Sequence, residues 1–279
     1  MRIATWNVNS LKARLDRVED GLGIATPDVL LMQETKLSDE AAPVMPFAMA
    51  GYELAHHGQG RWNGVAIASR VGIADVVTNF GDGPVVAPGG PPAGGGPVSG
   101  DDAADDGLGP EARMISARCG GIRVVSIYAP NGRALGTPFY EGKLAWYERL
   151  GRWLAETQDP ADALLIGGDF NVAPDDLDVY DPGAYVGATH VSPPERAALA
   201  RLRDWGLVDV VRPFHPEPGF YTWWDYRAGN FHKNLGMRID HLYATRSVAA
   251  RTVAAERDRD ARKGKLPSDH APLYVDIAG

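Results

Sequence analysis

Short apolar runs recur along the chain, separated by Gly, Pro and Asn residues. Runs of this length that are rich in Val, Ile, Leu and Tyr predict β-strands. The predicted strands are Ile3–Trp6, Val29–Met32, Gly64–Ala68, Met114–Ala117, Arg123–Tyr128, Ala163–Ile166, Ile239–Ala244 and Pro272–Ile277. A chain with this many short strands is expected to fold around layered sheets.

Helical periodicity separates some of these strands. An apolar stripe at helical spacing follows Ser10, a residue typical of an N-cap, and continues to Leu22. Further helices are predicted at Leu144–Leu154 and at Pro193–Trp205, where Glu195 lies in the first turn. Because other strands follow one another without a helix, we expect an α/β fold with two sheets packed face to face and helices outside.

One segment breaks this pattern. Val85–Gly109 is rich in Gly, Pro and Asp and has no periodicity, so it is expected to be a disordered or weakly ordered loop. We expect a single domain over residues 1–279 that carries this loop as an insertion at about 81–111.

Charge and cysteine content limit the class of protein. The net charge is −8, but residues 81–111 contribute −6, which leaves −2 for the rest of the chain. This balance neither supports nor excludes a polyanionic partner. The single cysteine, Cys119, predicts a reducing, cytoplasmic location. Neither a signal peptide nor an apolar run of about 20 residues is visible, so no membrane association is expected.

Polar side chains that suit hard cations or phosphate follow several predicted strands. Asn7, Glu34, Asp169, Asp240 and the Asp269-His270 pair all occupy such positions. Each has a plainer interpretation as a solvated carboxylate, a turn or a helix cap. Asp240 fits these least well, because it lies in an apolar strand and a buried carboxylate needs a partner. Together they indicate a site built from loops at strand ends.

Longer strings surround these residues. They are Thr5–Leu11, Gln33–Lys36, Asn63–Ile67, Tyr128–Gly132, Gly168–Pro174, Thr222–Arg227, Gly236–Asp240 and Pro267–Pro272. In composition and order the set resembles the exonuclease III group of apurinic/apyrimidinic endonucleases, within the endonuclease/exonuclease/phosphatase superfamily. The long acidic loop is a departure from that pattern.

The resemblance implies a DNase I-like fold, a four-layer α/β sandwich with its site at one end of both sheets. It implies that Glu34 is the principal Mg²⁺ ligand and that Asp169 orients or deprotonates the attacking water. Asp240 would fix the tautomer of His270. The other implied roles are Asn7 beside the metal, Asn171 on the phosphate or water, Asp269 in or near the metal shell and Tyr128 on the scissile phosphate.

The implied chemistry agrees with physical expectation. Phosphodiester hydrolysis builds negative charge on an anionic phosphate, which a cation neutralises. Mg²⁺ prefers oxygen ligands, and Mn²⁺ is an expected substitute. The resemblance also implies that Asp169, Asn171 and His270 lie near the metal. His270 could be a protonated phosphate donor or a neutral base, and one or two ions could operate.

The segment Phe220–Asn234 interleaves aromatic and basic residues, as expected of a nucleic-acid contact. Trp223 resembles the family's aromatic residue that lines the pocket for an extruded abasic sugar. The expected substrate contacts are Trp223, Asn131, Arg113, Arg227 and Lys265. Trp224 and Tyr226 could instead belong to the core, and the basic residues between Arg257 and Lys265 could be a solvated face.

The resemblance implies a Mg²⁺-dependent DNA-repair phosphodiesterase, monomeric and acting on double-stranded DNA. Its expected activities are 3′-to-5′ exonuclease, incision 5′ to abasic sites and 3′-phosphatase. The alternatives are a phosphatase or lipid phosphodiesterase on the same scaffold, and a DNA-binding member without catalysis.

Overall fold

A computed structural model describes residues 1–83 and 111–279, and within them twelve strands form two six-stranded sheets. Across the first sheet the order is β11 (Thr252–Arg257), β12 (Leu273–Ile277), β1 (Arg2–Asn7), β2 (Val29–Gln33), β4 (Val65–Ser69) and β3 (Glu53–His57). Across the second it is β5 (Ala74–Thr78), β6 (Met114–Cys119), β7 (Ile122–Tyr128), β8 (Leu164–Asp169), β10 (Asp240–Thr245) and β9 (Leu207–Asp209).

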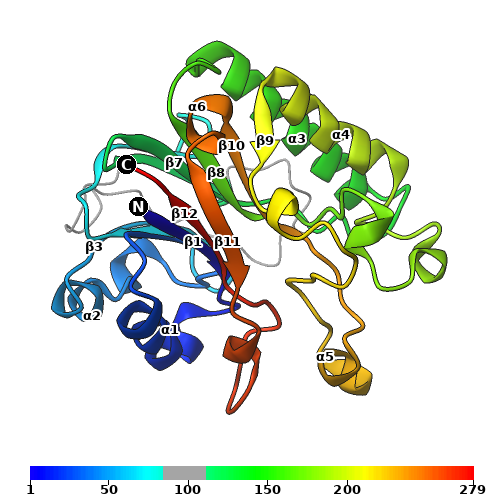
Figure 1. The fold of residues 1–279 in the computed structure, drawn as a ribbon, viewed down its shortest axis with the longest axis horizontal. Coiled ribbons are helices and arrows are strands. Elements are labelled where there is room, and N and C mark those ends of the chain that lie inside the picture. Colours follow the sequence, from blue (N-terminus) through cyan, green and yellow to red (C-terminus); the bar gives the residue numbers. More distant parts are fainter. Residues whose placement is uncertain (84–110) are drawn as a thin grey trace.

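Helices cover the outer face of each sheet (Figure 1). The first sheet carries α1 (Leu11–Ala25) and α2 (Val44–Met49), and the second carries α3 (Pro138–Thr157) and α4 (Pro193–Trp205). The shorter helices are α5 (Asn230–Lys233), α6 (Arg246–Ala249) and the 3₁₀ turns Asp39–Ala41, Asp176–Asp178, Pro182–Tyr185, Arg212–Phe214, Arg227–Gly229 and Arg259–Arg262. The expected four-layer α/β sandwich is confirmed.

Local capping explains where the long helices begin. The Ser10 side chain accepts from the backbone of Ala13 at the start of α1. Ser192 and Glu195 form a capping box at the start of α4, whose predicted bounds are confirmed. The helix predicted at Leu144–Leu154 is longer than expected, because Thr137 caps it and α3 begins at Pro138.

Three apolar layers hold the sheets and helices together. The central layer lies between the sheets and includes Ile3, Leu31, Ile115, Leu165 and Leu242. On the outer faces, one layer joins the first sheet to α1, and another joins the second sheet to α3 and α4. The two sheets therefore pack as one rigid scaffold between the helices.

The eight predicted strands are the eight inner strands of the two sheets, and the four edge strands were not predicted. These are β3, β5, β9 and β11. The predicted loop insertion falls mainly on residues 84–110, which lie outside the described residues. None of the helices in the described part of the chain is long and apolar enough to cross a lipid bilayer.

Strand direction gathers the predicted site at one end of the molecule. β1 runs parallel to β2 through α1, and β7 runs parallel to β8 through α3. Because Nδ2 of Asn7 at the end of β1 lies 2.9 Å from Oδ2 of Asp169 at the end of β8, all four strands end on the same side. β10 and β12 run antiparallel to β8 and β1 and begin there. The ends of these six strands therefore lie together at one end of the two packed sheets.

Candidate active site

Two carboxylates and an imidazole meet where the strands end. Glu34 follows β2, Asp169 is the last residue of β8, and His270 lies just ahead of β12. One candidate ligand atom from each lies within 4.8 Å of the other two. Residues separated by more than 200 positions in the sequence thus form one cluster of the kind that was predicted.

Asn7 connects the two carboxylates. Its Nδ2 donates to Oε1 of Glu34 at 2.8 Å and to Oδ2 of Asp169 at 2.9 Å, and its side chain is fully buried. The backbone N–H of Asn9 in turn donates to Oδ1 of Asn7 at 3.0 Å. This amide fixes how far apart the two carboxylates lie.

His270 is held by a carboxylate on the opposite sheet. Its Nδ1 donates to Oδ2 of Asp240 at 2.8 Å, and its Nε2 lies 3.8 Å from Oδ2 of Asp169. Burial by itself lowers the pKa of His270, but the charges of Asp240 and Asp169 outweigh that effect and raise the pKa well above its usual value. The structure therefore favours a protonated imidazole.

Asp169 lies in a site crowded with negative charge. Burial raises the pKa of its carboxyl; His270 opposes this shift, while Asp240 and Glu34 add to it. Oδ1 of Asp240 is buried and has no hydrogen-bond partner among the described residues. Carboxylate oxygens in excess over the cationic groups are the donor set that a hard divalent cation requires, so these residues fit such an ion.

Asn171 and Asn131 lie beside Asp169. The backbone N–H of Asn171 donates to Oδ1 of Asp169 at 2.9 Å, and its Nδ2 donates to the carbonyl of Ala129 at 2.9 Å. Nδ2 of Asn131 donates to Oδ1 of Asn171 at 3.4 Å. Tyr128 ends β7 in register with Asp169. The structure thus places three of the expected phosphate and substrate contacts together.

Trp223 and Asp269 form the neighbouring wall. The indole N–H of Trp223 donates to Oδ2 of Asp269 at 3.0 Å, and Nδ2 of Asn9 donates to Oδ1 at 2.9 Å. Burial raises the pKa of Asp269, but His270 and these two hydrogen bonds outweigh it and lower the pKa below its usual value. Asp269 therefore stays ionised next to His270.

Two polar residues at the site were not assigned roles from the sequence. Nζ of Lys36 lies 2.9 Å from Oε2 of Glu34 and donates to Oδ1 of Asn9 at 2.5 Å. Asn9 lies two positions after Asn7, and Lys36 lies two positions after Glu34. Both residues belong to the strings that resemble the family. This closeness in sequence to predicted site residues could have identified them, because the chain turns back at the strand end.

The other three expected substrate contacts differ in their surroundings. Arg227 is exposed and pairs with Asp225, and Lys265 is exposed in the loop before β12. Arg113 is 1% exposed, and its Nε donates to Glu111 at 2.6 Å. Its guanidinium also lies 4.9 Å from the ring centre of Tyr128. Arg113 thus lies against Tyr128, and its role as a substrate contact stays a prediction.

The aromatic and basic residues near Trp223 divide between core and surface. Trp224 is fully buried, which confirms the core alternative for it, whereas Tyr226 is 52% exposed. The guanidinium groups of Arg259 and Arg262 lie 4.2 and 5.0 Å from the ring centre of Phe231. Because these cations stack on aromatic rings, the basic stretch is only partly a solvated face.

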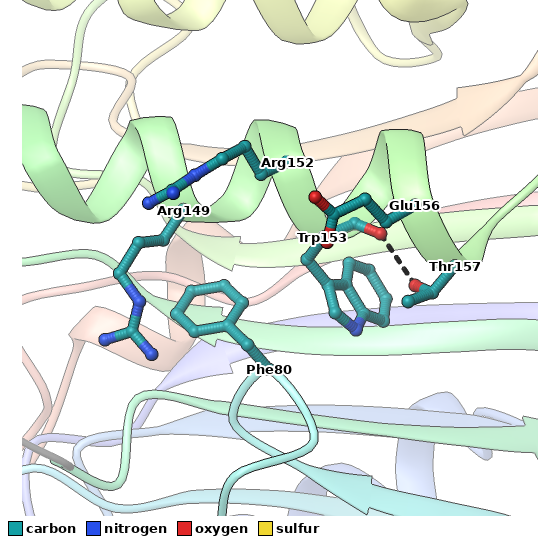
Figure 2. A pocket seen from close by; sticks show the side chains of 6 residues that line it. All are labelled: Phe80, Arg149, Arg152, Trp153, Glu156 and Thr157. Carbon is teal, nitrogen blue, oxygen red and sulfur yellow. Dashed lines mark hydrogen bonds between the residues drawn. The ribbon is translucent and has the colours of Figure 1, made fainter.

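A pocket of about 230 Å³ lies elsewhere, beside α3 (Figure 2). Its lining includes none of the residues predicted for the site. Arg149 lies 4.6 Å from the ring centre of Phe80 and pairs with Asp82. The pocket is therefore separate from the cluster at the strand ends.

Comparisons with known proteins agree with this geometry. The profile of the Endonuclease/Exonuclease/phosphatase family matches residues 4–270. Exodeoxyribonuclease III of Haemophilus influenzae is 32% identical over 290 aligned positions, covering 99% of this chain and 100% of that protein. The 3′ phosphatase NExo from Neisseria, solved with product DNA hairpin, is 37% identical with a TM-score of 0.86, and both chains are covered completely.

An AP endonuclease from Archaeoglobus fulgidus is 34% identical with a TM-score of 0.87, and 99% of each chain is covered. Sequence and fold thus match over nearly the full length. The chain belongs to the Endonuclease/Exonuclease/phosphatase family.

Proposed function

We propose that this protein is a divalent-metal-dependent phosphodiesterase that acts on DNA in repair. The observation that carries the proposal is the convergence of Glu34, Asp169 and His270 at one end of the two sheets. Similar proteins are named exodeoxyribonuclease III, 3′ phosphatase and AP endonuclease, and one was solved with a DNA product. These names support DNA as the substrate.

The donor set favours Mg²⁺, with Mn²⁺ as a substitute. Glu34 and Asp169 would hold the ion through carboxylate oxygens, and Asn7 keeps the two carboxylates at a fixed separation. The other residues proposed to lie near this metal site are Asn171, Asp269 and His270. When bound, the ion neutralises phosphate charge and polarises the scissile P–O bond.

The remaining steps belong to the chain's own groups. Asp169 would accept the proton of the attacking water. His270, kept protonated by Asp240, would donate from Nε2 to a phosphate oxygen. Asn171 and Tyr128 would hold the phosphate between these two groups.

The proposed activities are 3′-to-5′ exonuclease on double-stranded DNA, incision 5′ to abasic sites and 3′-phosphatase. Trp223 supports the choice of damaged DNA, because its half-buried ring forms a wall of the site and can contact a sugar that lacks a base. Exposed Arg227 and Lys265 would contact backbone phosphates. A cytoplasmic monomer completes the proposal, and the buried free thiol of Cys119 fits that location.

One assay tests the proposal. Purified protein is incubated with a duplex bearing one abasic site, a recessed 3′ end or a 3′-phosphate, each with Mg²⁺ and with a chelator. We expect metal-dependent cleavage of these duplexes. The proposal fails if no duplex is cleaved while a lipid or inositol phosphate is hydrolysed, or if DNA is bound without turnover.

A further inference from the structure

A fully buried ion pair joins α3 to the start of α4. Nζ of Lys143 lies 2.5 Å from Oε1 of Glu195, and both side chains are 0% exposed. Burying two charges is costly, and apolar replacements of such pairs are often neutral or stabilising. Stability alone therefore does not account for this pair.

The ammonium of Lys143 also reaches the candidate active site. Its Nζ donates to the backbone carbonyl of Asn171 at 2.7 Å and to that of Asn131 at 3.2 Å. These residues lie on the loops that follow β8 and β7. One buried cation thus fixes two loops whose side chains were assigned to the phosphate.

Glu195 fixes the ammonium in turn. Its Oε1 accepts from Oγ1 of Thr189 at 2.7 Å and from the backbone N–H of His190 at 2.9 Å, and its Oε2 accepts from Oγ of Ser192 at 2.6 Å. A carboxylate with this many donors has one orientation available. Glu195 therefore fixes the position of the Lys143 ammonium, and the ammonium in turn fixes the two loops.

The packing leaves Lys143 little freedom to move. Gly132 has φ +84°, and a Cβ there would lie 2.9 Å from Cδ of Lys143. Asn171 has φ 51°, a left-handed conformation that is uncommon for a residue other than Gly. The hydrogen bond from Lys143 stabilises the carbonyl of a residue in this conformation.

We propose that Lys143, oriented by Glu195, is a positioning residue that sets Asn131 and Asn171 relative to Asp169 for phosphodiester cleavage. The inference rests on the proposed function. Its physical basis is that catalytic side chains on loops need rigid support behind them, since a displacement of about 1 Å can slow turnover about 100-fold.

The test removes both charges together. In the double variant Lys143→Met, Glu195→Gln, chain volume and the Ser192 cap are largely kept and neither partner is left as an unpaired buried charge. We expect kcat on abasic DNA to fall about 100-fold, with KM changed less than about 3-fold. Glu195→Gln alone leaves the Lys143 ammonium buried without its partner, so it should lower the melting temperature more than the double variant does and lower kcat about 10-fold by the same mechanism.

A second measurement separates positioning from general stability. If Lys143 acts through Asn171, the double variant should lose little further kcat when Asn171 is already Ala, because the two changes remove one function. Leu150→Val is the matched control. Leu150 is fully buried on α3 but packs in the outer core, so this variant should lower the melting temperature and keep kcat.

The outcomes distinguish the two proposals. If the unaltered protein does not cleave DNA, the proposed function has failed. If it does cleave DNA, and Glu195→Gln and the double variant keep kcat, the positioning role is wrong. It is equally wrong if their losses multiply fully with that of Asn171→Ala, or if Leu150→Val loses as much kcat at equal destabilisation.

Discussion

Nδ1 of His270 donates to Oδ2 of Asp240 at 2.8 Å, and this bond connects the two sheets at their shared end. Asp240 is the first residue of β10, and His270 lies just ahead of β12. The bond fixes the ring so that Nε2 faces Asp169. The hydrogen bond that connects the two sheets therefore also orients the imidazole that is proposed to donate to the phosphate.

Asp240→Asn should lower kcat about 100-fold, because the imidazole loses the charge that keeps it protonated and oriented. Single-turnover cleavage of abasic DNA measures the effect. Asp276→Asn is the matched control: Asp276 pairs with Arg2 at the other end of β1 and should leave cleavage unchanged. Equal rates for both variants would contradict the role of Asp240.

Asp169→Asn should reduce turnover at least about 100-fold while DNA affinity stays within a few-fold of the original. The amide cannot accept a proton from water, but the surfaces that contact the DNA backbone remain in place. Binding is measured by fluorescence anisotropy with a chelator present. If affinity and turnover fall together, Asp169 has a structural role instead.

Mg²⁺ should stabilise the folded protein, because the carboxylates gather only in the folded state. At 100 times its dissociation constant, the ion should add about 2.7 kcal/mol to the free energy of unfolding. Glu34→Gln should lose most of this response, whereas Asp276→Asn should keep it. A response of equal size in the Glu34 variant would place the ion elsewhere.

Acid should destabilise the fold through His241, which is fully buried on β10. Burial, with the charge of Arg238 adding to it, lowers the pKa of His241 to about 4. The unfolded chain therefore binds a proton below its reference value of about 6.5 while the folded chain does not. Stability from this group is present above that value and is lost as the pH falls toward 4.

Between pH 7 and pH 5 His241 alone should contribute about 2 kcal/mol to the loss measured by urea unfolding. His241→Gln keeps a donor for the carbonyl of Val172 but does not titrate, so its stability should change less over the same range. An identical dependence on pH in both proteins would show that other groups cause the acid sensitivity.

The sequence by itself determined the layers and the chemistry. Inner strands are buried on both faces, so their apolar runs are visible without a structure. The edge strands β3, β5, β9 and β11 escaped notice because their sequences carry charged and polar residues. The polar residues at strand ends were also visible, since each follows an apolar run.

Only the tertiary structure decided which polar and aromatic residues face the site. Trp224 and Tyr226 lie two positions apart with similar character, yet one is buried and the other exposed. Arg113 follows the same rule: its basic character was visible, but its burial against Glu111 was not. Lys143 resembles a surface lysine until α3 and α4 pack together. Local patterns record a residue's chemistry, whereas its partner depends on contacts between segments far apart in the sequence.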